Sequence, residues 1–356
     1  MHRGADSPSP MTSGSGDGES PRRLTHWLKM ASSAARSIAL DCSFLLFSTP
    51  TGSATPVIYW GMSDASAVVA LDAHHFAVAD DEDNVLRIYS RLSGGLPIRS
   101  VDLSTFLAVD PRWPEVDLED AARVGDRVYW ISSHGRNKKG IERVSRYRFF
   151  ATSVVEGENM ANLVPTGRPY LGLLEDLLND PNVARFGLTS AAQRAPKARG
   201  ALNIEGLCAM PDGRLLLGFR NPIPDGKALV VPLENPRDVI AGQTAKFGVP
   251  ILLDLEGRGI SGMTAASGKY LIAARSYDGQ GQSFLYEWAG GADKPRRIEH
   301  SDLATFNPEG LAVFSERSGE QLFIVSDDGT LKVGRKKAKR LKNPNQKRFR
   351  AVTIGL

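Results

Sequence analysis

The sequence predicts an all-β fold: a single β-propeller of about five four-stranded blades with a small helical insertion. Three observations predict it: short strand-like runs separated by turn residues, five aligned repeats about 50 residues apart, and a strand-like C-terminus able to close a ring. Of the 356 residues, 42% are hydrophobic and 24% are charged, as in ordinary globular proteins. This composition excludes a wholly disordered or fibrous chain.

The N-terminal part of the chain differs from the rest. Residues 1–23 are rich in Ser, Gly, Pro and Asp, which indicates disorder. Residues 24–47 resemble a late secretory signal, although charged residues interrupt the apolar stretch, and a misassigned start codon or a first strand is the favoured alternative. We therefore expect a poorly ordered extension over residues 1–50 and a propeller domain over residues 51–356. No run of 18 apolar residues occurs, so no membrane span is expected.

Five segments align without gaps. The first position of each is a small polar residue, the second is variable, the third is Glu or Ser, and the fourth is a small residue or Asp. An apolar run follows, and after a loop each segment leads to a second apolar strand with a polar end. They start at Asp64, Asp117, Asn203, Gly259 and Asn307, at intervals of 53, 86, 56 and 48 residues. Such spacing is typical of propeller blades. The long interval contains an insertion, residues 166–199, in which leucine spacing predicts a helix and Asp180-Pro181 predicts a further helix start.

Closing the ring requires one blade built from both ends of the domain, because an open ring leaves sheet edges unpaired. The candidate strands are VIYWG, from residue 57, and FRAVTIGL, residues 349–356. A sixth, degenerate blade formed by the termini is the alternative.

The third position of the repeats, which we call the glutamate column, holds Glu119, Glu205 and Glu309 in three repeats and serine in two. At the start of innermost strands these carboxylates would meet at one channel mouth, where their repulsion requires a cation or protonation. Oxygen ligands of this kind, with Asn203 and Asn307 nearby, suit Ca²⁺. The alternative is structural: each glutamate accepts hydrogen bonds from the backbone of the neighbouring blade.

Basic residues and a histidine follow the second strands. His134 and Arg136 come after RVYWIS, and Arg220 ends RLLLGFR. Histidine suits general acid–base chemistry, and the arginine fork binds carboxylate or phosphate. We expect an anion to be held between these three residues on one rim of the channel. The alternative is a surface hairpin whose cations are simply solvated.

The other motifs are weaker evidence for a functional site. GRGISG, residues 257–262, fits a dinucleotide loop only in its glycines, because a strand and not a helix follows, so no nucleotide cofactor is expected. DDEDN, residues 80–84, resembles a calcium loop but lacks its glycine and final glutamate, and a solvated turn is the alternative. SDDG, residues 326–329, is a turn sequence. The apolar surroundings of Cys208 predict a core position.

The net charge of +4 is concentrated in one segment. Residues 335–350 hold nine Lys or Arg and no acid, which leaves 35 bases against 40 acids elsewhere. This basic loop is either solvated or a contact for an anionic partner. Nucleic acid is expected to bind only there, if at all.

From about residue 60 onward, most of the chain resembles a bacterial family, domain of unknown function 3616. The similar phrases are DDEDNVLRIY, SSHGRNKKG, ILLDLEGRGI, FNPEGLAV and the NIEGL…GFRNP stretch. The resemblance implies a β-propeller-like fold and no established reaction. A more distant similarity, to gluconolactonases, paraoxonases and esterase-like phytase propellers, implies Ca²⁺ on the glutamate of a Glu-Gly segment. Glu205-Gly206 and Glu309-Gly310 fit that pattern, and Glu119-Asp120 departs from it.

The leading functional expectation is a metal-dependent hydrolase of an ester, lactone or phosphoester. In it Ca²⁺ on the glutamate column would polarise a substrate oxygen, His134 would move protons, and Arg136 and Arg220 would orient an anionic small molecule. The alternative is a non-catalytic binding propeller, a scaffold for an acidic partner; carboxylates paired with backbone or arginine would favour it. The two cysteines, Cys42 and Cys208, give no sign of a disulfide, which favours the cytoplasm, with export as the alternative.

Overall fold

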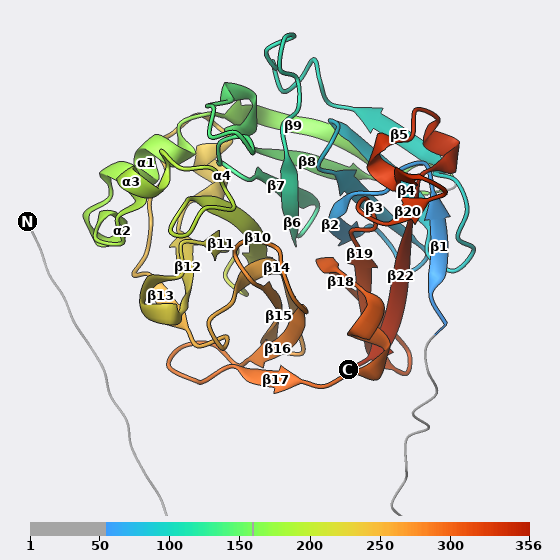
Figure 1. Cartoon of the computed structure of the whole chain (residues 1–356). Coiled ribbons are helices and arrows are strands. Elements are labelled where there is room, and N and C mark those ends of the chain that lie inside the picture. The colour runs from blue at the N-terminus through green and yellow to red at the C-terminus, as the bar shows by residue number, and fades with distance from the viewer. Residues whose placement is uncertain (1–54, 159) are drawn as a thin grey trace, which may run out of the picture. The chain divides into compact units, whose positions relative to one another are not determined.

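A computed structural model of the protein describes residues 55–158 and 160–356. The predicted disordered extension and the signal-like stretch 24–47 therefore lie outside the described residues. The described part forms five four-stranded antiparallel sheets arranged as the blades of a ring (Figure 1). The predicted five-bladed propeller is confirmed.

Four blades are built from consecutive strands. Blade 1 holds β2 (Ala65–Ala70), β3 (His75–Asp80), β4 (Val85–Ser90) and β5 (Arg99–Asp102). Blade 2 holds β6 (Leu118–Val124), β7 (Arg127–Ser132), β8 (Phe149–Val155) and β9 (Asn162–Tyr170). Blade 3 holds β10 (Asn203–Ala209), β11 (Leu215–Asn221), β12 (Ala228–Leu233) and β13 (Ile251–Leu253). Blade 4 holds β14 (Gly259–Ala266), β15 (Lys269–Arg275), β16 (Phe284–Trp288) and β17 (Arg296–Ile298).

The fifth blade closes the ring with strands from both ends of the described chain. It holds β18 (Pro308–Glu316), β19 (Gly319–Ser326), β22 (Arg348–Gly355) and β1 (Val57–Trp60), and β1 pairs antiparallel with β22. The predicted closing pair is confirmed, and the described residues form no sixth blade. A small hairpin, β20 (Lys332–Val333) and β21 (Lys336–Lys337), lies between β19 and β22 and includes part of the basic segment.

The hydrophobic core is divided among the blade interfaces. Each of the five clusters of buried apolar side chains joins two adjacent blades. Strands such as β7 are buried on both faces for this reason, which explains their continuous apolar sequence RVYWIS. Cys208 is buried in the cluster between blades 3 and 4, as expected.

The five repeats form the innermost strands, which pack against one another around the channel in the order β2, β6, β10, β14 and β18. The insertion holds three short helices, α1 (Leu173–Asn179), α2 (Pro181–Ala184) and α3 (Leu188–Ala191), which pack into the core between blades 2 and 3. Asp180 caps α2 by accepting hydrogen bonds from two backbone N–H groups, as its sequence predicts. A fourth helix, α4 (Pro236–Val239), follows β12. No helix in the described part of the chain is long and apolar enough to cross a membrane.

Candidate functional site

The glutamate column coincides with a β-bulge in every innermost strand. In β10, Ile204 pairs with Phe219 and Gly206 pairs with Gly218, so Glu205 has no partner on β11. The same register shift omits the column residue of the other four strands, namely Ser66, Glu119, Ser261 and Glu309. A bulge adds one residue to a strand and re-aims its side chain. The repeats therefore align in sequence at the point where each blade turns one side chain out of its sheet.

In two blades the column residue locks neighbouring blades together. Ser66 Oγ donates a hydrogen bond to the Leu118 carbonyl at 2.5 Å, and Ser261 Oγ donates one to the Pro308 carbonyl at 3.2 Å. Each acceptor directly precedes the column glutamate of the next blade. A hydrogen bond between blades, which the sequence left open for the glutamates, is therefore made by the serines at this position.

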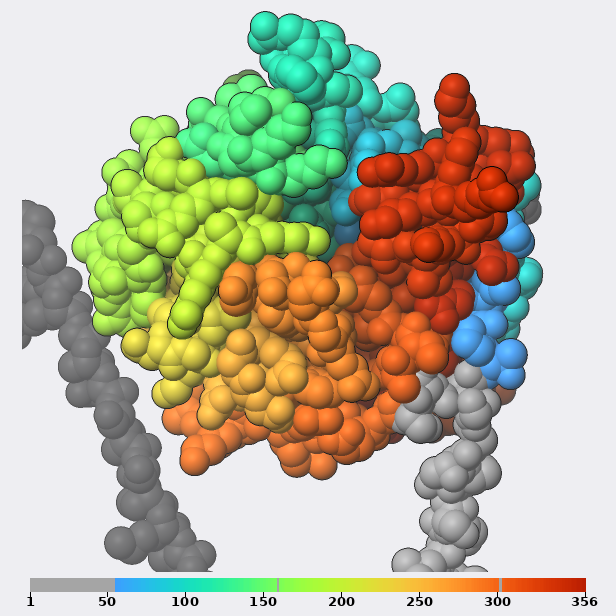
Figure 2. Space-filling view, in the orientation of Figure 1, coloured from blue at the N-terminus to red at the C-terminus, as the bar shows by residue number. Residues whose placement is uncertain are grey.

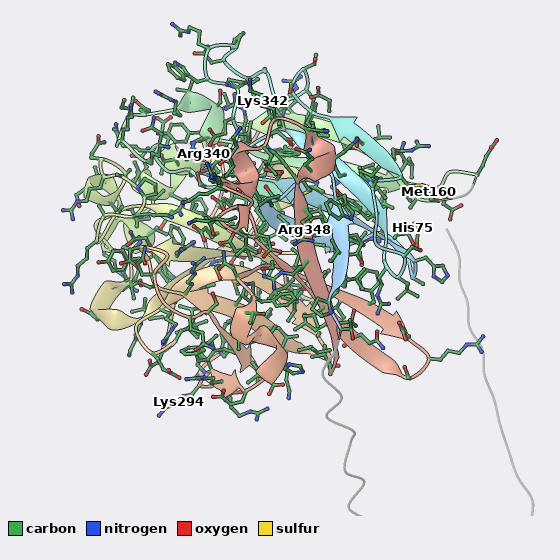
Figure 3. The ribbon with its side chains drawn as sticks, turned by 45° about the vertical axis from the view of Figure 1, so that its right-hand side comes forward. His75, Met160, Lys294, Arg340, Lys342 and Arg348 are labelled. Atoms are coloured by element: carbon green, nitrogen blue, oxygen red, sulfur yellow. The ribbon has the colours of Figure 1, made fainter. Side chains whose placement is uncertain are left out.

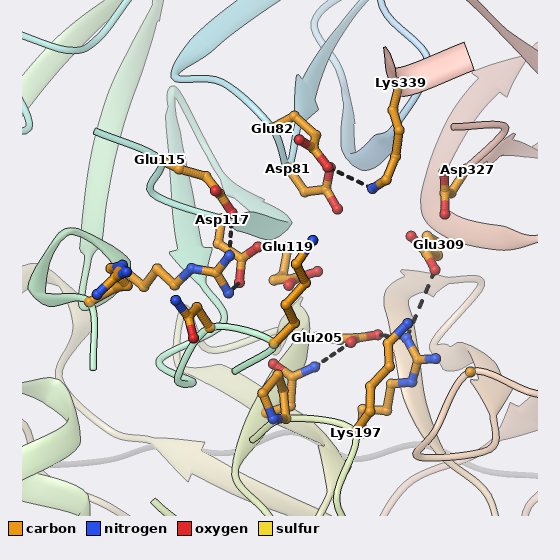
Figure 4. A pocket seen from close by; sticks show the side chains of 18 of the residues that line it. Asp81, Glu82, Glu115, Asp117, Glu119, Lys197, Glu205, Glu309, Asp327 and Lys339 are labelled. Carbon is orange, nitrogen blue, oxygen red and sulfur yellow. Dashed lines mark hydrogen bonds and ion pairs between the residues drawn. The ribbon is translucent and has the colours of Figure 1, made fainter. Parts of the chain in front are cut away.

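In the other three blades the column residue faces a cavity of about 1090 Å³ at the channel mouth, which Figure 4 shows from close by. Eight acidic residues line it: Asp81, Glu82, Glu115, Asp117, Glu119, Glu205, Glu309 and Asp327. Nine basic residues also line it: Lys138, Lys139, Arg143, Arg146, Lys197, Arg220, Arg275, Lys337 and Lys339. The structure therefore brings the three predicted glutamates and Arg220 to one cavity.

Two of the three glutamates are paired with arginine. Glu205 Oε2 accepts a hydrogen bond from Arg220 Nη1 at 2.5 Å, and its Oε1 accepts one from the Asn203 amide. Glu309 Oε1 lies 3.5 Å from Arg275 Nη1 and 3.9 Å from Arg220 Nη1. Burial, together with the charge of Asp327, raises the pKa of Glu309 well above its usual range.

Glu119 differs from them. It is partly buried and makes no hydrogen bond or ion pair with any described residue. Burial and the nearby Glu205 carboxylate raise its pKa well above the usual range. Asn203 and Asn307, expected near a cation, donate their amide N–H groups to Glu205 and Glu309, while Asn203 Oδ1 is buried without a hydrogen-bond partner.

Three aspartates of blade 1 lie closer together than the glutamates do. Asp64, Asp80 and Asp81 each offer an oxygen within 4.8 Å of the others, and in the described part of the chain no other trio of acidic, histidine or cysteine side chains meets that condition. We call them the aspartate cluster. Asp81 Oδ1 is buried without a hydrogen-bond partner. Burial and the charges of the other two aspartates raise the pKa of Asp81, and burial with Asp83 and Asp64 raises that of Asp80 to about 7.

Part of the basic segment folds over the cavity mouth. Lys339 Nζ lies 3.1 Å from Asp64 Oδ1 and 2.6 Å from Glu82 Oε1. The Lys339 backbone N–H donates to the Gly329 carbonyl, which holds the segment in place. Figure 2 shows this segment, in red, on the same visible face as the yellow-green insertion and across it to the right. Arg340 and Lys342 of the same segment remain exposed (Figure 3).

The structure places His134 and Arg136 outside the residues that line the cavity. His134 is 1% exposed, and its Nδ1 lies 2.8 Å from the Ser132 carbonyl oxygen, so the neutral ring carries its proton on Nδ1. Burial lowers its pKa to about 4. Arg136 donates to the carbonyls of Ala192 and Gly140 and so ties its loop to the insertion. Of the three residues expected to share an anion, only Arg220 faces the cavity.

The cavity residues that were not predicted as site residues from the sequence include Asp81, Lys197, Arg275 and Lys339. Arg275 carries a detectable signal, because KYLIAAR ends in arginine as RLLLGFR does. Asp81 lies within the weak calcium-like phrase DDEDN. Lys197 and Lys339 lie in segments with no equivalent in the other repeats, so the repeat alignment cannot identify them.

Comparisons with known proteins agree with the resemblance stated above. The family described as "Protein of unknown function (DUF3616)" matches residues 150–341. No curated protein matches the chain.

Several solved structures are similar in fold. The PQQ-bound aldose sugar dehydrogenase from Streptomyces coelicolor shares 12% identity over 85% of this chain and 99% of its own, with a TM-score of 0.39. Glutaminyl cyclase from Myxococcus xanthus shares 14% over 85% and 97%, with a TM-score of 0.42. The GH43_1 enzyme from Xanthomonas citri complexed with xylose shares 11% over 85% and 91%, with a TM-score of 0.46.

Proposed function

The chain belongs to the DUF3616 family of proteins of unknown function, whose description names no reaction, and we propose from the cavity itself that it is a divalent-cation-dependent hydrolase of an anionic ester, lactone or phosphoester. One observation carries the proposal. Glu119 and Glu205 interact on one cavity, yet Glu205 is held by an arginine and an asparagine whereas Glu119 has no partner. Two carboxyl groups in unequal environments are the arrangement that acid–base catalysis requires.

The two glutamates take complementary roles. Burial and the nearby Glu205 carboxylate raise the pKa of Glu119 and so favour its protonated form, which suits Glu119 to protonate a leaving oxygen. Glu205, held by Arg220 and Asn203, has a fixed orientation from which it can accept a proton from the attacking water. His134 has no place in this scheme, because it does not line the cavity.

The aspartate cluster, and not the glutamate column, fits the cation best. Its donor atoms are all carboxylate oxygens, which Ca²⁺ and Mg²⁺ prefer, and Asp81 Oδ1 is buried and lacks a partner. Asp64, Asp80 and Asp81 would hold the cation. When bound, it would polarise an ester or phosphoryl oxygen of the substrate.

The rim favours a negatively charged substrate. Lys138, Lys139, Lys197 and Lys337 are exposed on the cavity rim and have no ion-pair partner among the described residues. Uncompensated cations around a cleft raise the local concentration of anions.

The test is an activity screen on the full-length protein. After EDTA treatment, Ca²⁺, Mg²⁺, Mn²⁺ or Zn²⁺ is restored, and hydrolysis of p-nitrophenyl acetate, p-nitrophenyl phosphate and a δ-lactone is measured. We expect cation-dependent hydrolysis of one of the three, with kcat lowered about 100-fold or more in Glu119→Gln. Glu234→Gln is the matched control, because Glu234 pairs with Arg214 away from the cavity. Hydrolysis of none of the three, or unchanged activity in Glu119→Gln, would contradict the proposal.

A second readout tests the cation alone. A ligand present at 100 times its Kd stabilises the folded state by about 2.7 kcal/mol. We expect Ca²⁺ to raise the melting temperature of the wild type and to have no effect on Asp81→Asn. Glu309→Gln should retain the rise, which would separate the aspartate cluster from the glutamate column.

A non-catalytic binding propeller is the second candidate function. The pairing of Glu205 with Arg220 and of Glu309 with Arg275 favours it, since those carboxylates already have partners. Failure of the activity screen together with selective capture of an acidic peptide would support this candidate.

A further inference from the structure

Basic groups from blades 3 and 4 and from the insertion also line the cavity. Arg220 and Arg275 follow the same position of β11 and β15, and Lys197 comes from the loop after α3. Figure 4 shows Lys197 extending into the cavity beside Glu205. These groups are cationic, whereas the aspartate cluster of blade 1 is acidic.

Arg220 is buried but keeps one free edge. The residue is 4% exposed; its Nε donates to the Ser276 carbonyl at 3.1 Å, and its Nη1 donates to Glu205. Its Nη2 has no acceptor among the described residues. Two bonds thus fix the guanidinium plane, and the remaining nitrogen is available to a ligand.

Lys197 Nζ approaches the same point as Arg220 Nη2. Gly279 has φ = +77° and bears no side chain; a methyl group there would lie 3.0 Å from Arg220 Nη2 and 3.3 Å from Lys197 Nζ. The two nitrogens therefore approach the same point, and Arg220, Lys197 and Gly279 all line the cavity; we call this part of the cavity the hollow beside Gly279. Lys197 forms no ion pair with any described residue. Asp278, the nearest acid in sequence, has Oδ1 engaged by the Ser276 hydroxyl and the Gln280 N–H.

Basic groups gather at the hollow. Arg220, Arg275 and Lys197 are the cations, and Glu205, Glu309 and Asp278 are the acids beside them. The two glutamates are already paired with arginine, whereas Lys197 and Arg220 Nη2 have no acidic partner among the described residues. These free donors favour a ligand with several acceptor oxygens, such as a phosphate monoester, which carries about −1.5 to −2 at pH 7.

We propose that Lys197 and Arg220 together bind a phosphate group carried by the substrate, in the hollow beside Gly279. An arginine edge and a lysine point charge are both common phosphate ligands. The inference rests on the proposed function, because it names the substrate class of that site. It assigns an anchoring role to the pair, so the substrate would be a phosphorylated compound whose reacting bond lies elsewhere in the cavity.

The test measures binding without catalysis. Inorganic phosphate and acetate are titrated into the full-length protein by calorimetry at constant ionic strength. We expect phosphate to bind and acetate to bind at least tenfold more weakly. Lys197→Met should weaken phosphate binding about tenfold or more, and Lys197→Arg should restore most of it. Since Lys197 is exposed, neither substitution should prevent folding.

Two control variants show whether the loss is local. Lys294→Met changes an exposed lysine at the edge of the molecule away from Lys342 in Figure 3, and phosphate binding should be unchanged. Lys138→Met removes a rim cation; a loss equal to that of Lys197→Met would show diffuse attraction and overturn the proposal. Equal affinities for phosphate and acetate, or full binding by Lys197→Met, would also overturn it.

The outcomes separate this inference from the proposed function. Phosphate binding that depends on Lys197, without any hydrolysis, would leave the anchor in place and contradict the hydrolase. Hydrolysis without phosphate binding would support the hydrolase and contradict the anchor. If both hold, phosphate should raise KM in the wild type and have little effect on KM in Lys197→Met.

Discussion

Lys339 Nζ lies 3.1 Å from Asp64 Oδ1, although 275 positions separate the two residues in the sequence. Asp64 begins the first repeat and is 1% exposed, whereas Lys339 belongs to the basic segment near the C-terminus. The lysine thus supplies a positive charge to the aspartate cluster, where a divalent cation is proposed to bind. A resident ammonium group and an added cation compete for the same carboxylate oxygen.

Replacing this lysine should therefore lower the stability of the cation-free protein and raise its affinity for Ca²⁺. In EDTA, Lys339→Met should lower the melting temperature, because it leaves the Asp64 carboxylate uncompensated; with the ammonium group partly exposed, about 1–2 kcal/mol is expected. With Ca²⁺ present, the variant should gain more than the wild type and bind Ca²⁺ about tenfold more tightly, ~1.4 kcal/mol. Thermal unfolding at several Ca²⁺ concentrations measures both effects.

Lys336→Met is the control, because Lys336 is an exposed lysine of the same basic segment without an ion pair among the described residues. It should behave as the wild type in EDTA and in Ca²⁺. A Lys339→Met protein with an unchanged response to Ca²⁺ would show that the ammonium group and the cation do not share a site.

Asp120 fastens three blades at the channel. This residue is fully buried; its Oδ2 accepts hydrogen bonds from the backbone N–H groups of Leu207 at 2.7 Å and Met263 at 3.1 Å, and its Oδ1 accepts one from Ala121. Asp120→Asn keeps the shape but puts an N–H₂ group against N–H donors. We expect a loss of about 3 kcal/mol in the free energy of unfolding, because buried donors lose their acceptor.

Urea denaturation checks this expectation. Asp120→Ala, which installs the small residue that blade 1 has as Ala67, serves as the companion variant and should be at least as destabilised. If Asp120→Asn were as stable as the wild type, the carboxylate could not be the link among the three blades.

The ring and its innermost strands could be predicted from the sequence because every blade repeats one local pattern. The apolar run needs a small residue at its start, where blades approach closely, and this constraint is visible as Gly206, Gly262 and Gly310. Closure by β1 and β22 followed from the cost of an unpaired edge. The innermost strands could thus be predicted from local sequence, and the ring closure from the general rule that sheet edges are not left unpaired.

The site could be predicted only in part. The column position was identified: glutamate faces the cavity in three repeats, and serine, for which no role was predicted, hydrogen-bonds to the next blade in two. The lysines that share the cavity with the glutamates could not be identified from the sequence, because Lys197 and Lys339 reach it through loops whose paths depend on the whole fold. His134 was expected at the rim, but its bond to the Ser132 carbonyl turns the ring back into the interior.

A substitution at Gly262 tests how closely blades 4 and 5 approach each other at the channel. A Cβ atom at this position would lie 2.1 Å from the Glu309 carbonyl oxygen, which belongs to backbone and cannot rotate away. Gly262→Ala should therefore cost about 2–3 kcal/mol and displace Glu309. Denaturant unfolding measures the cost. Gly355→Ala is the matched control, because a Cβ there meets nothing within 4 Å, and it should be neutral within about 0.5 kcal/mol.

The buried His134 should make the protein sensitive to acid. Its pKa is lowered to about 4 in the folded state, from 6.5, because burial disfavours the charged ring. The unfolded state binds the proton first as pH falls, so the stability contributed by the neutral ring is complete above pH 6.5 and is lost between about pH 6.5 and pH 4. At pH 5 the loss should amount to about 2 kcal/mol.

His134→Asn removes this titration and retains a side-chain N–H that can donate to the Ser132 carbonyl. Urea unfolding of both proteins at pH 7 and pH 5 isolates the effect, because all carboxyl groups contribute equally to the two proteins. The wild type should lose about 2 kcal/mol more than the variant between these pH values. His74→Asn, which changes an exposed histidine, should follow the wild type. Parallel losses in the wild type and His134→Asn would mean that the ring is charged inside the folded protein.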